Sequence, residues 1–424
     1  MKVVLAFPPQ AVPFLPHQAP AQLVAVLKSR GISAMQKDYN LEAYEYFLSS
    51  GRLKQFGISP MMAEQVEEEK SNLRNGKDFF VPDKYFQSIA VLQNYLGNIS
   101  GQYPGCRFSF KDFEIAGYDT EKSRDIIQAS GDEKRNPFID FFKEKIEELK
   151  QLEPQILGIS IAWKSQLVPG FTLARLVKKY LPHTHICMGG SMISHLSDLL
   201  KTRVELFEYT DSFIPFDGEI GLAELAENIE GKNFSKVSGL IYKHKGKIIS
   251  NPVSIPTNLN LLPLPDFSGL ELDKYYSPKV YLPVNLSRGC YWSGCQFCTH
   301  HLSASSFRIK NPVTMLEEMN SLNNRYGCSN FYFVDDAFPP EQGKVLAELI
   351  RKNEKSYRWA GEFRMEKMMD EDYFHTLHDG GCRLALFGLE SYCDRILNKM
   401  NKGWDTSRVK NILASAHNAG IKTW

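Results

Sequence analysis

Apolar and polar positions alternate along this chain in two separate series of strand-like and helix-like segments. The first series opens with an apolar run over residues 2–6, a helical pattern over 20–30 that stops at Gly31, and a returning strand. It resumes at Gln155 with strand patterns over 155–163, 184–190 and 211–219 and helical patterns over 169–182 and 221–231. Strands that alternate with helices predict a parallel, doubly wound sheet.

Residues 41–150 interrupt this series. They are rich in Glu, Lys, Asn and Phe and carry helical patches such as PFIDFFKEKIEELKQLEP. We expect a mostly helical insertion here, and the sequence assigns no function to it.

A second series follows a hairpin pattern over residues 238–250 and a stretch dense in Pro and Leu. This stretch predicts a boundary near Pro265 between a first domain, residues 1–265, and a second domain, residues 266–424. Strand patterns occur at 279–287, 330–338, 357–366 and 383–391, helical patterns at 312–327, 341–355, 370–382 and 408–420, and a fifth strand begins at 421–424.

Length and composition narrow the class of protein. The chain has 424 residues, which favours at least two domains, and a net charge of +1, which does not favour nucleic acid as a partner. No apolar run approaches the roughly 18–20 residues of a membrane span, and Pro8 and Pro9 make the start a buried strand rather than a signal peptide. We expect a cytoplasmic protein with no nucleic-acid or membrane partner.

Three of the eight cysteines form a constellation in SRGCYWSGCQFCTHH, residues 287–301. Cys290, Cys295 and Cys298 lie in a Gly-containing loop directly after a strand, where ligand sites are common. Thiolates are soft ligands, so clustered cysteines indicate a metal or reactive sulfur.

Four kinds of chemistry compete for this loop. A structural zinc site needs a fourth ligand, which His300 or His301 supplies. A redox pair of Cys295 and Cys298 leaves Cys290 unexplained, and Thr299 stands where haem attachment requires His. The fourth option is an iron–sulfur cubane. Such clusters usually take four cysteines, so three would leave one iron open for a ligand.

The loop resembles that of radical S-adenosylmethionine (radical SAM) enzymes, whose usual spacing is CxxxCxxC. Here the first gap is one residue longer, as in some cobalamin-dependent members that resemble peptide-maturation C-methyltransferases. FVDDAF, WAGEFRMEKM, GCRLALFGLESYCDRILNKMNKG and HNAGIKTW resemble later barrel segments of the family, in order. ILGISIAWKSQLVPGFTLARLVKKYLPHTHICMGGSMIS and FDGEIGLAEL resemble its cobalamin-binding domain.

The resemblance implies a Rossmann-like, cobalamin-binding domain followed by a partial (β/α)6 radical SAM barrel. It implies that Cys290, Cys295 and Cys298 ligate a [4Fe–4S] cluster whose open iron takes S-adenosylmethionine. Four kinds of contact to that ligand are then expected in the second domain: an aromatic beside the adenine, carboxylates at the ammonium, an arginine at the carboxylate, and a carboxylate at a strand end. The residues are Phe297, Asp335, Asp336, Arg364 and Glu390.

In the first domain, the resemblance implies cobalamin contacts at the ends of three strands. These residues are Ser160, Trp163, Gln166, Gly189, Gly190 and Gly218. The DxHxxG motif for the lower cobalt ligand is absent, so we expect a structural role for His17, the one histidine near the first strand.

The expected function is a cobalamin-dependent C-methyltransferase acting on a small molecule or a peptide, with a flavodoxin or ferredoxin as electron donor. Two alternatives stay open: a radical SAM enzyme without methyl transfer, and an inactive metal-binding protein. The family barrel has six strands and this chain ends as the fifth begins, so we also expect a fragment of a longer protein.

Overall fold

The computed structural model describes residues 2–303 and 306–424, and the chain forms two compact units. The first unit comprises Met1–Ile255 and Pro265–Lys279, and the second comprises Pro256–Leu264 and Val280–Trp424. The linker region therefore contributes one short segment to each unit. The boundary predicted near Pro265 falls at the point where the chain returns to the first unit.

The first unit is built on a seven-stranded sheet with the order β2-β1-β5-β6-β7-β8-β9. The first five strands in this order are parallel, and β8 and β9 form the predicted antiparallel hairpin. The strands are β1 (Lys2–Phe7), β2 (Ser33–Asp38), β5 (Ile156–Ser160), β6 (His185–Gly189), β7 (Ser212–Ile214), β8 (Ile241–His244) and β9 (Lys247–Ser250). The order runs in opposite directions from β1 and β5, so the predicted doubly wound sheet is confirmed.

Helices cover both faces of this sheet because right-handed crossovers that lead in opposite directions place their helices on opposite sides. Helix α1 packs against α12, while α8 packs against α9. The apolar stripes of these helices supply much of the buried core, including Val24, Leu173 and Leu225. The helices are α1 (Gln18–Ser29), α9 (Leu167–Tyr180), α10 (Ser191–His195), α11 (Ser197–Leu200) and α12 (Gly218–Asn228).

The segment predicted as a helical insertion is helical except for one small hairpin, β3 (Cys106–Phe108) and β4 (Phe113–Ile115). Stacked and edge-to-face aromatic rings, among them Tyr44, Phe108 and Phe138, form its core. Its last helix completes the crossover from β2 to β5. The helices are α2 (Tyr39–Phe47), α3 (Ser50–Gln55), α4 (Pro60–Arg74), α5 (Gly76–Phe79), α6 (Pro82–Ser100), α7 (Ser123–Ser130) and α8 (Phe138–Leu152).

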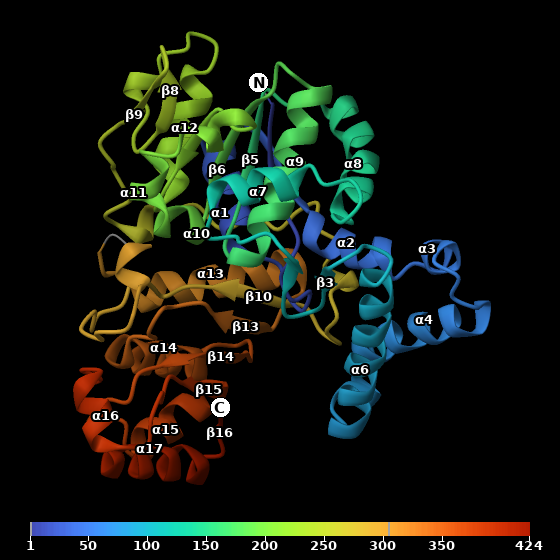
Figure 1. The fold of residues 1–424 in the computed structure, drawn as a ribbon. Coiled ribbons are helices and arrows are strands. Elements are labelled where there is room, and N and C mark those ends of the chain that lie inside the picture. The colour runs from blue at the N-terminus through green and yellow to red at the C-terminus, as the bar shows by residue number, and fades with distance from the viewer. Residues whose placement is uncertain (1, 304–305) are drawn as a thin grey trace. The chain divides into compact units, whose positions relative to one another are not determined.

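The second unit carries a five-stranded, all-parallel sheet whose strands stand in chain order, β10-β13-β14-β15-β16 (Figure 1). This order is that of successive βα units, as expected for the first five strands of the predicted barrel. The strands are β10 (Tyr281–Val284), β13 (Asn330–Phe333), β14 (Arg358–Phe363), β15 (Cys382–Phe387) and β16 (Lys422–Thr423). The helices are α13 (Pro312–Tyr326), α14 (Pro340–Lys352), α15 (Glu371–Asp379), α16 (Asp394–Lys399) and α17 (Thr406–Asn418).

Local signals set the ends of the first of these helices. The side chain of Asn311 caps α13 by accepting a hydrogen bond from the backbone N–H of Val313, and Pro312 occupies the first turn. Gly327 ends the helix with φ +65°, a conformation that glycine adopts without strain. Helix α13 therefore follows the predicted range, 312–327.

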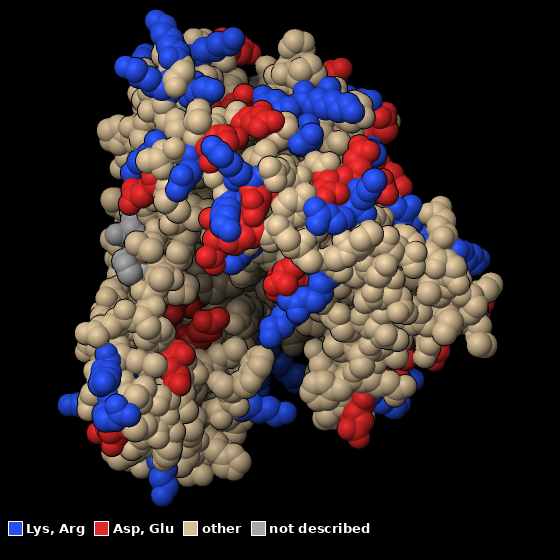
Figure 2. Space-filling model, in the orientation of Figure 1, with Lys and Arg blue, Asp and Glu red and all other residues tan. Residues whose placement is uncertain are grey.

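Charged side chains of both signs are interspersed on the face drawn in Figure 2, in keeping with a net charge of +1. The exposed large apolar residues include Met61, Phe80 and Phe86 in the helical segment of the first unit. Within the two described ranges, no helix has both the length and the apolar character needed to cross a membrane.

Candidate functional site

The three clustered cysteines lie in a loop that a short ladder closes at its base. Strands β11 (Ser287–Arg288) and β12 (Arg308–Ile309) pair antiparallel directly after β10. Between them lies the stretch that we call the cysteine loop, residues 289–307. It begins at Gly289, where φ is +77° and a Cβ atom would lie 2.8 Å from the carbonyl oxygen of Ser306. The ladder and this close approach fix where the loop leaves the sheet.

Cys290, Cys295 and Cys298 are all half-buried, and none is in a disulfide. The Sγ atom of Cys298 accepts a hydrogen bond from the backbone N–H of His300 at 3.4 Å. Within residues 2–303 and 306–424, no three potential ligands are already gathered into a metal-binding group. The donor set suits a soft metal, and the thiols would have to converge to hold one. The side chain of His301, a possible zinc ligand, lies outside the described residues.

A second segment holds the cysteine loop in place. We call residues 400–404, which follow α16, the clamp. Gln296 donates its backbone N–H to the Met400 carbonyl at 3.0 Å, and Trp292 donates its indole N–H to the Asn401 carbonyl at 3.0 Å. Asn401 in turn donates from Nδ2 to the Gly294 carbonyl at 2.8 Å. Trp292 stands within the gap that is one residue longer than usual, so the longer gap is packed against the clamp.

Arg364 ties these two segments together from the end of β14. Its Nε atom donates to Glu366 at 3.0 Å, and its Nη2 atom donates to the Lys402 carbonyl at 2.8 Å. Its Nη1 atom lies 3.9 Å from the Sγ atom of Cys295. The guanidinium also lies over two indole rings, at 4.1 Å from the centroid of Trp292 and 4.7 Å from that of Trp404. All three nitrogens of this buried side chain therefore have protein partners, whereas the sequence predicted a ligand carboxylate.

The two aspartates after β13, Asp335 and Asp336, have different hydrogen-bond partners. Asp335 is buried and accepts hydrogen bonds from the backbone N–H groups of Leu286 and Ser287, at 3.2 and 2.5 Å, and from the Ser287 hydroxyl at 2.6 Å. Burial raises its pKa to about 7. Asp335 thus braces the strand end that leads into the cysteine loop, while the predicted role was a contact to a ligand ammonium. Asp336 faces His300, with 3.1 Å between Oδ1 and Nδ1, and this hydrogen bond raises the pKa of His300.

The remaining predicted residues of this unit lie next to the clamp. The ring of Phe297 is 47% exposed and lies 5.4 Å from the ammonium of Lys402, which is buried. Glu390 lies 3.7 Å from the same ammonium and has φ +62°. A left-handed backbone at a residue other than glycine costs energy and is concentrated at functional sites. The structure therefore brings Phe297 and Glu390 to one place, together with a lysine that the sequence analysis did not single out.

In the first unit, the predicted residues lie at the ends of β5, β6 and β7, and β5 stands beside the point where the strand order reverses. Ligands bind at such switch points in doubly wound sheets. Gln166 is fully buried: its Oε1 atom accepts the backbone N–H groups of Ala162 and Trp163, and its Nε2 atom donates to the Pro8 carbonyl at 2.6 Å. It ties the loop after β5 to the loop after β1, so its polar atoms are used within the protein.

The other predicted residues of the first unit differ in side-chain exposure and in the space around their backbone. The buried hydroxyl of Ser160 has no hydrogen-bond partner among the described residues, and the Trp163 side chain is 47% exposed. Gly190 has φ +103°, and a Cβ atom there would lie 2.3 Å from the Ile161 carbonyl oxygen, so only glycine fits. A Cβ at Gly189 would lie 3.0 Å from a backbone oxygen, whereas at Gly218 it would make only an ordinary contact with Leu23.

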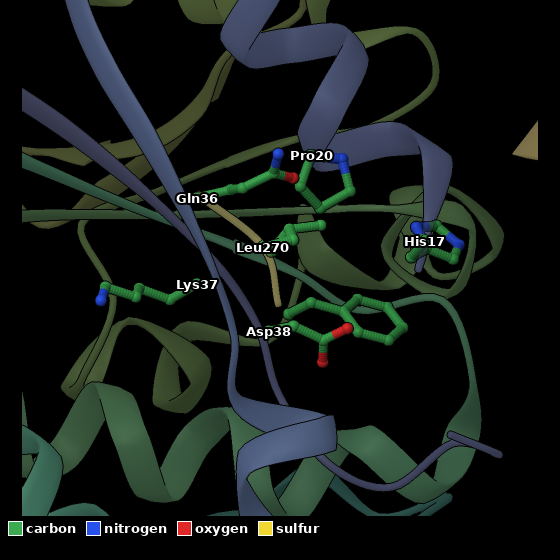
Figure 3. A pocket seen from close by; sticks show the side chains of 7 residues that line it. His17, Pro20, Gln36, Lys37, Asp38 and Leu270 are labelled. Atoms are coloured by element: carbon green, nitrogen blue, oxygen red, sulfur yellow. The ribbon is translucent and has the colours of Figure 1, made fainter. Parts of the chain in front are cut away.

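His17 packs as a structural residue would. Its ring stacks on Phe7 with 4.6 Å between centroids and meets the Trp163 ring edge-on at 5.5 Å. Its Nδ1 atom is buried and has no hydrogen-bond partner in the part of the chain that the structure describes, and burial lowers the pKa of the ring to about 4. Figure 3 shows the pocket that it lines at the ends of β1 and β2. Its lining combines the apolar side chains of Pro20 and Leu270 with the polar ones of Gln36, Lys37 and Asp38.

Sequence reasoning missed the clamp. Its first four residues, MNKG, end the segment that resembles the family's fourth strand, and Trp404 follows directly. No pattern in this stretch shows which loop it will contact. A tryptophan in the lengthened cysteine gap and another in the clamp were the available signal, because large aromatics near a ligand loop are often packed against partners.

Comparison with known proteins relates the second unit to a described protein family. Residues 284–424, which include the cysteine loop and the clamp, match the radical SAM superfamily. Residues 284–424 therefore carry a radical SAM domain.

Curated relatives match a longer part of the chain than this domain alone. An uncharacterized methyltransferase of Pyrococcus horikoshii is 26% identical over 279 residues, 64% of this chain and 60% of that protein. The anaerobic magnesium-protoporphyrin IX monomethyl ester cyclase of Cereibacter sphaeroides is 26% identical over 291 residues, 65% of this chain and 46% of that protein. This chain thus spans about half the length of the curated relatives it matches.

Two solved structures share the fold over the whole chain. One is the cobalamin-dependent S-adenosylmethionine radical enzyme OxsB with aqua-cobalamin and S-adenosylmethionine bound, with a TM-score of 0.65 and 14% identity, matching 48% of its length. The other is the radical S-adenosylmethionine methyltransferase TsrM of Kitasatospora setae with tryptophan and a SAM analogue, with a TM-score of 0.60 and 15% identity, matching 66% of its length. The predicted combination of a Rossmann-like domain with a partial radical SAM barrel is therefore confirmed at the level of fold.

Proposed function

We propose that this protein is a radical SAM enzyme in which Cys290, Cys295 and Cys298 hold a [4Fe–4S] cluster. One observation carries the proposal: three thiols share one loop, and that loop is fixed at its base by a ladder and along its length by the clamp. The backbone N–H of His300 donates to the Cys298 sulfur, and the Arg364 guanidinium lies near the Cys295 sulfur. Thiolates are the ligands of such clusters.

The cluster and cobalamin, when bound, supply the electron for reductive cleavage of S-adenosylmethionine and a carrier for its methyl group. The protein's part is to hold, orient and shield these groups. Asp335 fixes the strand end before the cysteine loop, and Arg364 joins the loop to the clamp. The half-exposed ring of Phe297 offers a stacking surface for a base beside the last cysteine.

Cobalamin would bind at the switch point of the first unit. The half-exposed indole of Trp163 suits a planar macrocycle, and the buried Ser160 hydroxyl lacks a partner that a ligand would provide. The close turn at Gly190 brings backbone to the same edge of the sheet. Relatives named as methyltransferases, and solved neighbours with cobalamin bound, support C-methylation as the reaction.

A small molecule or a peptide is the substrate that we propose, with a flavodoxin or ferredoxin as reductant. The names of the related proteins include enzymes acting on a tetrapyrrole ester and on a cytidylyl phosphonate. These names favour a small molecule over a peptide. A second candidate function is radical chemistry without methyl transfer, because the Cereibacter relative is named as a cyclase and not as a methyltransferase.

Anaerobic turnover with a chemical reductant tests the proposal. The cluster-loaded protein should form 5′-deoxyadenosine from S-adenosylmethionine, and alanine at Cys290, Cys295 or Cys298 should abolish it. Cys393, an exposed cysteine outside the loop, provides the control: Cys393→Ala should keep full activity. No 5′-deoxyadenosine from iron-loaded protein would contradict the proposal. Cobalamin in the purified protein, with methyl label passing from S-adenosylmethionine to a product, would separate methyl transfer from the second candidate.

A further inference from the structure

A group of lysines and an open sheet edge come together at one end of the first unit. Residues 231–255 contain five lysines and neither Asp nor Glu. Two of the lysines precede β8 and three belong to the β8–β9 hairpin: Lys232, Lys236, Lys243, Lys245 and Lys247. Figure 2 shows Lys and Arg side chains gathered at the end of this unit where Figure 1 labels β8 and β9.

The charges of these five lysines are not neutralised by ion pairs. All five residues are exposed, and within the two described ranges none of them has a carboxylate at salt-bridge distance. The acidic residues next to this stretch are Glu230, which directly precedes it, and Glu224, which accepts the backbone N–H of Ser238 at 2.7 Å. The lysines therefore give this end of the unit a positive potential.

The hairpin also leaves one edge of the seven-stranded sheet open. Strand β9 is the last of the order, and no strand of the described residues pairs with its outer side. The turn at residues 245–246 has φ +46° and +79° and closes on His244 and Lys247, which such turns join by backbone hydrogen bonds. Because bonded and non-bonded pairs alternate along an antiparallel ladder, the N–H and C=O groups of Ile248 and Ser250 face outward.

Asn251 supports this alternation and joins the remaining lysines to the same edge. Its backbone N–H donates to the Leu240 carbonyl at 3.0 Å, as the alternation requires. Its Nδ2 atom donates to the Phe234 carbonyl at 2.6 Å, which places the stretch with Lys232 and Lys236 at the end of β9. The other three lysines lie around the turn at which β9 begins. Positive charge therefore stands at both ends of the open edge.

These two features together select one kind of partner. An open edge presents backbone donors and acceptors, and an extended peptide matches both with its own backbone. The phosphates of a nucleic acid offer acceptors only, which leaves the outward carbonyls of β9 without a donor. A second copy of this edge would bring lysines opposite lysines, and like charges at an edge oppose such pairing. A chain of opposite charge is favoured by the same lysines.

We propose that the outer edge of β9 binds an extended, acidic peptide segment of a partner protein as an added strand. Backbone pairing with Ile248 and Ser250 gives the segment its register, and the lysines at both ends of the edge face its carboxylates. This inference concerns the first unit alone, and it does not depend on the cluster or on radical chemistry.

Fluorescence anisotropy on the intact chain tests the proposal with a labelled, acetylated octapeptide of alternating glutamate and threonine. Two companion probes each differ in one property. One has lysine in place of every glutamate, and the other keeps the glutamates but is N-methylated at every backbone amide, so that it cannot donate to a strand. The acidic probe should bind, and each companion should bind at least about tenfold more weakly.

Variants of the chain separate the edge from the charges. Ile248→Pro removes an outward N–H and keeps the β8–β9 ladder, so the acidic probe should bind at least about threefold more weakly. Ile248→Val keeps that N–H and should bind as wild type does. Lys243→Glu/Lys247→Glu should weaken binding at least about tenfold at low salt. Lys54→Glu/Lys77→Glu makes the same charge change at exposed lysines of the helical segment and should stay within about twofold.

The contrary results are equally defined. Equal binding of the N-methylated probe would mean that charge alone attracts the peptide, which overturns the added strand. Equal losses in Ile248→Pro and Ile248→Val would assign the effect to side-chain packing and overturn it as well. Wild-type protein that does not bind the acidic probe would contradict the proposal. A single-stranded oligonucleotide that binds where the acidic probe does not, and is lost in Lys243→Glu/Lys247→Glu, would replace the peptide by a nucleic acid.

Discussion

At the scale of single residues, a side chain whose chemistry suits ligand binding can instead make its contacts within the protein. The sequence predicted Arg364, Asp335 and Gln166 as ligand contacts. In the structure, the polar atoms of each side chain contact other groups of the protein. Arg364 donates to Glu366 and to the Lys402 carbonyl, Asp335 accepts from the start of the cysteine loop, and Gln166 joins two loops. These side chains fix the loops in which they lie, because buried polar groups that lack water must find partners nearby. Their contacts to a ligand stay predictions.

His17 supports a prediction about pH at the same scale. Burial lowers the pKa of its ring from 6.5 to about 4, so the unfolded chain takes up a proton at a higher pH than the folded chain does. The stabilisation is complete above pH 6.5 and is lost as the pH falls toward 4. At pH 5 the loss should be on the order of 2 kcal/mol.

The measurement compares wild type with His17→Phe, which keeps the stack on Phe7 and cannot titrate. Hydrogen exchange of β1 under increasing urea should show wild type losing stability relative to His17→Phe between pH 7.5 and pH 5. His183, an exposed histidine of the first unit, gives the control substitution His183→Phe. Parallel pH profiles for wild type and His17→Phe would mean that the ring titrates normally.

At the scale of elements, the clamp is the contact that organises the cysteine loop. Three hydrogen bonds join residues 292–296 to residues 400–401, more than a hundred positions away in the chain. Nothing in the local sequence around either segment specifies this pairing, which explains why strands and helices could be predicted and the clamp could not. The lengthened gap between Cys290 and Cys295 was visible in the sequence, but the segment that packs against it was not.

Asn401 tests the clamp directly. Asn401→Gly removes the bond to the Gly294 carbonyl and tolerates the residue's φ of +54°, so it isolates the lost side-chain contact. We expect amide exchange over residues 290–298 of the cluster-free protein to become several-fold faster, the effect of about 1 kcal/mol. Asn398→Gly in α16 is the control, since Asn398 is exposed. Unchanged exchange over the loop would show that the clamp does not order it.

Gly190 marks the tightest turn of the first unit. A Cβ atom there would lie 2.3 Å from the Ile161 carbonyl oxygen, so Gly190→Ala must displace the backbone after β5 or β6. We expect a loss of more than about 2 kcal/mol in the stability of these strands, measured by urea-dependent hydrogen exchange.

Gly31 provides a comparison variant with a positive φ and no close contact. It has φ +73°, and a Cβ atom added there would meet no atom within 4 Å, so Gly31→Ala reports the cost of the left-handed backbone alone, about 1 kcal/mol. Equal losses in the two variants would mean that the contact with Ile161 yields easily.

For the whole molecule, the sequence was sufficient to predict two α/β series and most of their strands and helices, but not the order of the strands within the first sheet. Strand–helix alternation carries this information, because each element's apolar spacing decides which face it buries. The helical segment after β2 was predicted as a separate insertion, yet its last helix, α8, packs beside α9 and completes the crossover to β5. Only the sheet order reveals that dual role.

The two proposed cofactor sites belong to different units, which leads to a prediction for the intact chain. Replacing all three loop cysteines by alanine should abolish iron binding and leave hydroxocobalamin binding, followed by its visible spectrum, unchanged. Trp163→Ala should do the reverse, weakening cobalamin binding with iron content intact, because Trp163 lies in the first unit. Loss of both cofactors from either variant would contradict this separation.

The central claim is that three thiolates hold a cluster with one iron open to S-adenosylmethionine. Electron paramagnetic resonance of anaerobically reconstituted, reduced protein, recorded with and without S-adenosylmethionine, tests it most directly. We predict a [4Fe–4S]⁺ signal that changes on addition of S-adenosylmethionine. A cluster signal indifferent to S-adenosylmethionine, or zinc bound in place of iron with no cluster signal, would contradict the claim.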